Sequence, residues 1–219
     1  MKNNFNPDKN RRSQYAVKPL VIALLILVVF VTLSLRGRYN NDDTTYALLV
    51  NTSEHDSTKS KEAFKKVYTV LMHPRCMNCH PAGDIPLQGE DSHPHTMAPR
   101  RGEDGKGLYA MKCANCHQNE NTPGPHRPPG NPLWHLPPAD MKMVFEGKSA
   151  RELALQLVDK TKNGNKSMAD LIEHAEDTLV KAGWKPAEGL ELPPMSHEEF
   201  KEAWITWIEN GAYAPDETD

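Results

Sequence analysis

The chain has 219 residues, 38 % of them hydrophobic, with 18 prolines and 13 glycines, so it can form one globular domain with prominent loops. Its formal net charge is only −3, and its basic residues are scattered after position 60 rather than gathered in a stripe. This pattern disfavours a phosphate-tracking surface, and we expect no nucleic-acid partner.

The first distinctive element is an uncharged apolar run at residues 19–35, PLVIALLILVVFVTLSL. A helix that crosses a bilayer needs about 17–25 such residues, and positive charge marks the cytoplasmic side. Lysine and arginine are more frequent before the run than after it. We therefore predict a cytoplasmic N-terminus at 1–18, a single-pass membrane anchor at 19–35, and a periplasmic location for the rest. A cleaved signal peptide is the alternative, although no A-x-A site follows the run.

Residues 36–57 are polar and unpatterned, which predicts a flexible linker before a folded domain at 58–214. The domain is expected to begin with a helix near 58–73 that Pro74 ends. One apolar stripe with helical spacing supports this prediction, formed by Phe64, Val67, Tyr68, Leu71 and Met72.

The middle of the chain is predicted to be irregular at 81–106 and at 121–140. The second of these segments is rich in proline, and we expect it to lie extended over an apolar surface. Between them, a helix is expected near 105–117.

Three further helices are predicted from paired residues with the spacing of a capping box: Ser149 with Glu152, Ser167 with Asp170, and Ser196 with Glu199. The second helix is expected to continue through SMADLIEHAEDTLVKAG, with His174 on its inward stripe. The last carries Phe200, Ala203, Trp204, Trp207 and Ile208 on one face and ends at Gly211. No strand pattern of useful length is present, so the fold class is predicted to be mainly α.

All four cysteines lie in two matching pentads, CMNCH at 76–80 and CANCH at 113–117. Disulfides, a redox dithiol and a zinc site are possible uses of such cysteines. However, two residues between partners make a very short disulfide ring, dithiol enzymes use one C-x-x-C near a βαβ unit, and zinc ribbons have shorter separations. None of these uses explains the histidine that closes each pentad.

Covalent haem attachment does explain that histidine. In C-x-x-C-H both thiols can form thioethers to one haem, while the adjacent imidazole reaches the iron from below. The sequence therefore predicts two covalently bound c-type haems, one held by Cys76 and Cys79 with His80 as proximal ligand, and one held by Cys113 and Cys116 with His117.

These motifs resemble those of c-type cytochromes. The run GKGLYAMKCANCH (105–117) is similar to the first helix of class I cytochromes, and HPRCMNCHP with GDIPLQGED resembles small di-haem subunits found beside isoquinoline oxidoreductase-type enzymes. The resemblance implies a cytochrome c-like di-haem domain of short helices and long loops. Because the pentads are only 37 positions apart, fewer than one class I domain contains, both haems are expected in one compact domain.

The function that the resemblance implies is electron transfer between redox partner proteins of a membrane or periplasmic chain, without catalysis of its own. The alternative is a di-haem peroxidase or oxidase with one open haem site. A haem-based sensor ranks last, because fewer than 20 residues are expected in the cytoplasm.

Each iron also needs a distal ligand if the protein is an electron carrier. His95, in the loop between the pentads, and Met141, after the proline-rich segment, are the preferred candidates, and His174 is a weaker one. The other candidates are histidines and methionines elsewhere in the domain: His93, Met97, His126, His135, Met143, Met168 and Met195.

Overall fold

A computed structural model describes residues 56–217 of the chain. The chain divides into two units, Met1–Glu54 and His55–Asp219, and the described residues belong to the second. The predicted cytoplasmic segment, the anchor and nearly all of the linker lie outside the described residues. Within residues 56–217, no helix has the length and apolar character that a membrane span requires.

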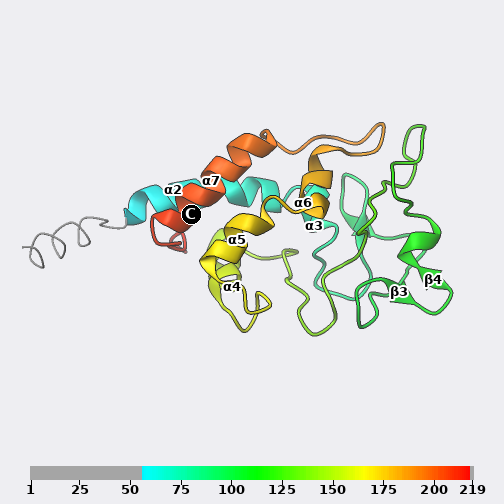
Figure 1. The fold of residues 1–219 in the computed structure, drawn as a ribbon, viewed down its shortest axis with the longest axis horizontal. Coiled ribbons are helices and arrows are strands. Elements are labelled where there is room, and N and C mark those ends of the chain that lie inside the picture. The colour runs from blue at the N-terminus through cyan, green and yellow to red at the C-terminus, as the bar shows by residue number, and fades with distance from the viewer. Residues whose placement is uncertain (1–55, 218–219) are drawn as a thin grey trace, which may run out of the picture. The chain divides into compact units, whose positions relative to one another are not determined.

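Helices dominate the described part, as predicted, and the strands are only two residues long (Figure 1). In chain order the elements are α2 (Ser57–Leu71), α3 (Pro74–Met77), β1 (Leu87–Gln88), β2 (His93–Pro94), β3 (Gly107–Leu108), β4 (Met111–Lys112), η2 (Cys113–Asn115), α4 (Ala150–Val158), α5 (Met168–His174), α6 (Thr178–Lys181), η3 (Ala182–Trp184) and α7 (His197–Glu209).

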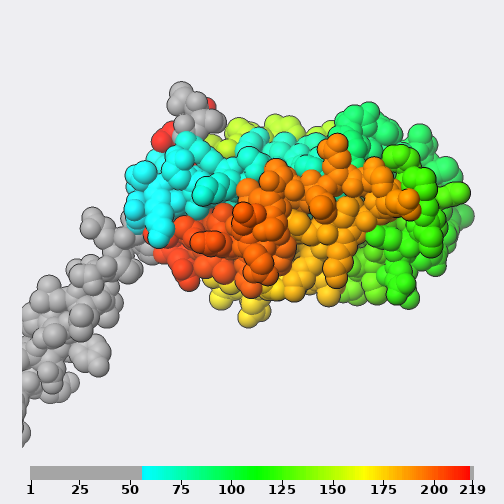
Figure 2. Space-filling model, turned by 90° about the horizontal axis from the view of Figure 1, so that it is seen from above, coloured from blue at the N-terminus to red at the C-terminus, as the bar shows by residue number. Residues whose placement is uncertain are grey.

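The hydrophobic core lies where α2 and α7 run side by side (Figures 1 and 2). The stripe of α7 is buried there, whereas in the α2 stripe Tyr68 and Met72 are only partly buried. The rings of Phe64 and Trp207 meet with their centroids 4.6 Å apart. Ser60 is also buried, and its hydroxyl donates to the Trp207 carbonyl at 2.9 Å and accepts from the Tyr213 N–H at 3.0 Å. This contact satisfies polar groups that would be costly to bury alone.

The three predicted capping boxes are confirmed at the starts of α4, α5 and α7. In each one the serine hydroxyl accepts from the backbone N–H three residues later, and the acidic side chain at that position accepts from the serine N–H. These reciprocal bonds satisfy backbone donors that the first turn leaves free, which explains why the helices begin at these serines.

The expectation of one continuous helix after Ser167 is wrong, because α5 ends at His174 and α6 begins at Thr178. Asp177 between them has an extended backbone, and its carboxylate accepts from the imidazole of His174 at 3.0 Å. His174 is consequently exposed rather than packed inward.

The expectation of a helix at 105–117 is also wrong. Strands β3 and β4, each two residues long, form an antiparallel hairpin there, and η2 after it is a single 3₁₀ turn. Gly105 and Gly107 have φ values of 75° and 89°, which L side chains rarely adopt. A Cβ on Gly105 would lie only 1.9 Å from the carbonyl oxygen of Leu136. The loop therefore packs closely against the backbone of Leu136, and only glycine leaves room for this contact.

The other half of the described part consists mainly of loops, as predicted for 81–106 and 121–140, with the addition of the β1–β2 hairpin. The segment of residues 185–195 crosses these loops before α7 begins (Figure 2). It is joined to them by bonds from Asn121 to the carbonyls of Lys185 and Pro186, and by the Glu191 N–H, which donates to Glu90.

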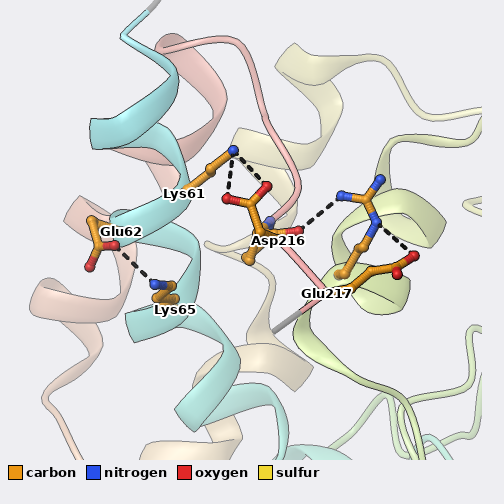
Figure 3. Close-up of polar contacts among 7 residues, drawn as sticks. Lys61, Glu62, Lys65, Asp216 and Glu217 are labelled. Atoms are coloured by element: carbon orange, nitrogen blue, oxygen red, sulfur yellow. Dashed lines mark hydrogen bonds and ion pairs between the residues drawn. The ribbon is translucent and has the colours of Figure 1, made fainter. Parts of the chain in front are cut away.

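The C-terminal segment is joined to the first helices by polar contacts (Figure 3). Lys61 of α2 pairs with Asp216 at 2.9 Å, while Arg151 of α4 donates to the Pro215 carbonyl at 3.0 Å and lies 3.9 Å from Glu217. Exposed ion pairs of this kind contribute little each. Together they connect residues 215–217 to both α2 and α4, and Pro215 in this segment is buried.

Candidate cofactor site

Both pentads line one cavity of about 1040 Å³. Sites for single small molecules measure about 300–1,000 Å³, so this cavity is large by that standard. Every cysteine and histidine of the two pentads borders it: Cys76, Cys79, His80, Cys113, Cys116 and His117. The two motifs therefore lie around a common cavity.

The first pentad is positioned by α3. Pro74 occupies the first turn of this short helix, where its missing N–H costs nothing, and the imidazole of His73 accepts from the Arg75 N–H. Pro74 thus both follows the end of α2 and begins the helix that carries Cys76. The second pentad is positioned by η2, which follows the β3–β4 hairpin directly.

The imidazole of His80 is held in one orientation. Its Nδ1 lies 2.7 Å from the carbonyl oxygen of Met143 and must donate to it, which leaves Nε2 as the nitrogen that can bind a metal. The ring stacks on Phe145, with centroids 3.8 Å and planes 7° apart. Burial lowers the pKa of His80 to about 4, so the ring is neutral at pH 7, the form that binds metals.

His117 repeats this arrangement with different partners. Its Nδ1 donates to the carbonyl oxygen of Pro129 at 2.8 Å, and its ring stacks on Trp134 with centroids 4.2 Å and planes 7° apart. Burial lowers its pKa as well. A backbone carbonyl on the second ring nitrogen is the usual means of fixing the tautomer of a metal-binding histidine.

No disulfide joins the four cysteines. Burial raises the pKa of Cys76 to about 12 and that of Cys79 to about 11, and the nearby Cys113 adds to the effect on Cys79. A redox dithiol needs the opposite shift, because its nucleophile is the thiolate. These surroundings disfavour a disulfide oxidoreductase.

The thiols also fail to converge as four zinc ligands would. Among the described residues, the group of three or more potential ligands with all donor atoms within 4.8 Å of one another is His73 with Glu90 and Glu191, and it contains no cysteine. A tetrahedral site would place four sulfur atoms about 2.3 Å from one ion. The geometry therefore disfavours one zinc ion between the pentads.

Most of the predicted distal candidates border the same cavity: His95, Met141, His174, Met97, His135 and Met143. His93 does not, and its imidazole instead donates to Asp91 at 2.6 Å. The thioether of Met143 accepts from Gln156 at 3.2 Å, while the methyl group of Met141 lies beside Gly164.

The residues that orient His80 and His117 were not predicted from the sequence. Phe145 carried no motif, and Trp134 was only part of the proline-rich segment expected to lie over an apolar surface. The carbonyl acceptors at Met143 and Pro129 leave no signal at all, because any residue supplies a carbonyl. The proline-rich segment does border the cavity. A tryptophan among prolines shortly after the second pentad is the sequence signal that could have indicated the ring beside His117.

A buried arginine fastens the loops around the cavity. Arg101 is 1 % exposed and donates to the carbonyls of Pro137 at 2.6 Å and Gly83 at 3.0 Å. It thus joins the loop that follows His80 to the proline-rich segment that follows His117. No sequence pattern indicated this role.

Comparison with protein-family models, with curated proteins and with solved structures finds no match for this chain.

Proposed function

We propose that residues 58–214 form a cytochrome c-like domain with two covalently attached haems, and that the protein carries electrons between a redox donor and an acceptor. In this proposal Cys76 and Cys79 hold one haem and Cys113 and Cys116 hold the other. His80 and His117 are the proximal ligands.

One observation carries the proposal: the two C-x-x-C-H histidines are oriented in the same way by unrelated partners. Each donates Nδ1 to a backbone carbonyl, each keeps Nε2 for a metal, and each is stacked on an aromatic ring at the border of one large cavity. A solvated or purely structural histidine has no need of this repeated arrangement. The cavity would also bring both porphyrins into one enclosure, which favours electron passage between them.

The haem would supply the redox chemistry, and the chain would orient it, restrict water and set its potential through ligands and burial. With the run at 19–35 as an anchor, the domain would face the periplasm, where c-type haem is attached and where a tethered carrier meets its partner proteins.

The proposal is tested by producing the full chain in a host that attaches c-type haem and measuring its intact mass and metal content. We expect two haems per chain and two reversible redox steps. Cys76→Ser with Cys79→Ser should remove one haem, and Cys113→Ser with Cys116→Ser should remove the other. Zinc in place of iron, or no covalent haem in the unmodified chain, would refute the proposal.

Carbon monoxide separates the carrier from the alternative, a di-haem peroxidase or oxidase. An enzyme of that kind keeps an iron position open for its substrate, so carbon monoxide would bind to the reduced protein. A carrier with both iron positions filled should show no such binding.

A further inference from the structure

The imidazoles of His95 and His117 are neighbours in the structure. Their ring centroids are 6.4 Å apart and their planes are inclined by 70°. His95 follows β2, and His117 follows η2, so separate elements bring the rings together. Both residues border the cavity.

This separation has the size of one coordinated metal ion. A direct hydrogen bond between two imidazoles would bring their centroids to about 5 Å. An imidazole nitrogen binds a metal at about 2.0–2.1 Å, so two imidazoles on opposite sides of one ion have centroids roughly 6–6.5 Å apart. The observed 6.4 Å agrees with the second arrangement.

His95 is held at this position by its backbone. Its N–H donates to the carbonyl of Pro86 at 2.9 Å, and its carbonyl accepts from the Ala98 N–H at 2.7 Å. The side chain of Gln88 accepts from both the N–H and the hydroxyl of Thr96 at 3.1 Å, which closes the loop after the β1–β2 hairpin. This is far more order than a solvated loop histidine requires.

The hydrogen bonds of the two rings indicate which nitrogen of each could bind a metal. Nδ1 of His117 donates to the Pro129 carbonyl. Nδ1 of His95 instead accepts from the Met97 N–H, with the two nitrogens 3.3 Å apart. His117 therefore has Nε2 free for a metal. His95 binds a metal through Nε2 only if its proton moves to Nδ1, and this shift would break the long bond from the Met97 N–H.

Among the described histidines, no other has a recorded ring contact with His117. His135 and His174 also have Nδ1 engaged and Nε2 left for a metal, but among the described residues neither ring is in contact with that of His117. His95 is therefore the candidate that the geometry favours.

We infer that His95 is the distal ligand of the haem held by the second pentad, which gives that iron two histidine ligands. This inference rests on the proposed function and deepens it. Two nitrogen ligands leave no open position at that iron and give it a lower potential than a histidine–methionine pair would. The second haem would then be a site of electron transfer rather than of substrate binding.

The test uses single-haem forms of the full chain, because they separate the two irons. In the Cys76→Ser, Cys79→Ser background, only the second haem remains. Adding His95→Ala should convert this haem from low spin to high spin and allow carbon monoxide to bind, and added imidazole should restore the low-spin spectrum. In the Cys113→Ser, Cys116→Ser background, His95→Ala should leave the spectrum unchanged.

His93→Ala is the matched control, because His93 lies two residues before His95 in β2, pairs with Asp91 and does not border the cavity. It should change neither spectrum. If a single-haem form fails to fold, the same substitutions in the two-haem protein still decide the question, because His95→Ala should convert half of the haem. Intact mass is measured on every sample. A low-spin second haem in His95→Ala with its mass intact would overturn the inference, whereas a missing haem in the unmodified chain would instead refute the proposed function.

Discussion

The imidazole of His80 lies flat on the phenyl ring of Phe145, with centroids 3.8 Å apart and planes inclined by 7°. The same short segment holds His80 by its backbone, because the Phe145 N–H donates to the His80 carbonyl at 2.9 Å and the Met143 carbonyl accepts from Nδ1 at 2.7 Å. Residues 143–145 thus determine the tilt and the rotation of the ring together.

Phe145→Ala should destabilise the protein by about 3–5 kcal/mol, the usual cost of emptying a buried phenylalanine site. Phe145→Leu keeps most of the volume and should cost clearly less, while it still removes the stacked ring. We therefore expect both haems to stay attached in Phe145→Leu and only the potential of the first haem to change. Urea unfolding and redox titration measure the two effects. A stability equal to that of the unmodified protein in Phe145→Ala would contradict the assigned packing.

Trp134→Phe should preserve the stack on His117, and Trp134→Ala should remove it and admit water to that side of the cavity. Because burial sets haem potentials, Trp134→Ala should shift the potential of the second haem more than that of the first. Redox titration of the two single-haem forms measures each shift separately. Equal shifts at both haems would show that Trp134 acts on the whole fold rather than on His117.

Arg101→Met should destabilise the protein by about 3 kcal/mol or more. It removes a buried cation whose bonds to carbonyls are worth about 1.5–3 kcal/mol each, and it leaves the carbonyls of Gly83 and Pro137 without that donor. Arg100→Met is the matched control. Arg100 is next to Arg101 in the sequence but its side chain is exposed, so this substitution should change stability little. Denaturant unfolding of both variants gives the comparison, and similar losses in the two would contradict the structural role of Arg101.

Asp84 should make stability depend on acid. Its carboxylate accepts from Lys142 at 2.7 Å and lies 3.8 Å from Arg101, and the hydrogen bond from Lys142, followed by the nearby positive charges, holds its pKa below the ordinary value. The folded state therefore favours the charged form. The resulting stability is present above pH about 4, the unfolded pKa of aspartate, and is lost as pH falls through the lower folded pKa.

Asp84→Asn should accordingly lose less stability than the unmodified protein when pH is lowered from about 4, because aspartate in the unfolded chain begins to bind protons there. Lys142→Met should reduce the acid dependence in the same direction, because it removes the main cause of the shift. Thermal unfolding as a function of pH is the measurement. Identical slopes in all three proteins would show that Asp84 titrates as a free carboxylate.

His174 and Met141 remain the candidates for the distal position of the first haem. Nδ1 of His174 is engaged by Asp177 at 3.0 Å, an arrangement common in metal-binding histidines, and the charge of His174 is among the causes that lower the pKa of His80. We expect His174→Ala, and not Met141→Leu, to make the first haem high spin. Visible and electron paramagnetic resonance spectra of the single-haem form decide between them, and the reverse result would assign Met141.

The sequence alone determined the features that depend on neighbouring residues. The three capping boxes and the apolar stripes of α2 and α7 are local patterns, and the structure places them as predicted. The motif C-x-x-C-H is equally local, and all six of its cysteines and histidines border the cavity.

Only the tertiary structure decided the features that depend on distant backbone. Gly105 packs against the backbone of Leu136 in a hairpin where a helix was expected, and another expected helix is interrupted at Asp177. The carbonyls of Met143 and Pro129 orient His80 and His117, yet no side-chain pattern encodes a carbonyl. Nor could the sequence choose His95 from its rivals, because its ring comes within 6.4 Å of the His117 ring, centroid to centroid, only when separate segments of the chain fold together.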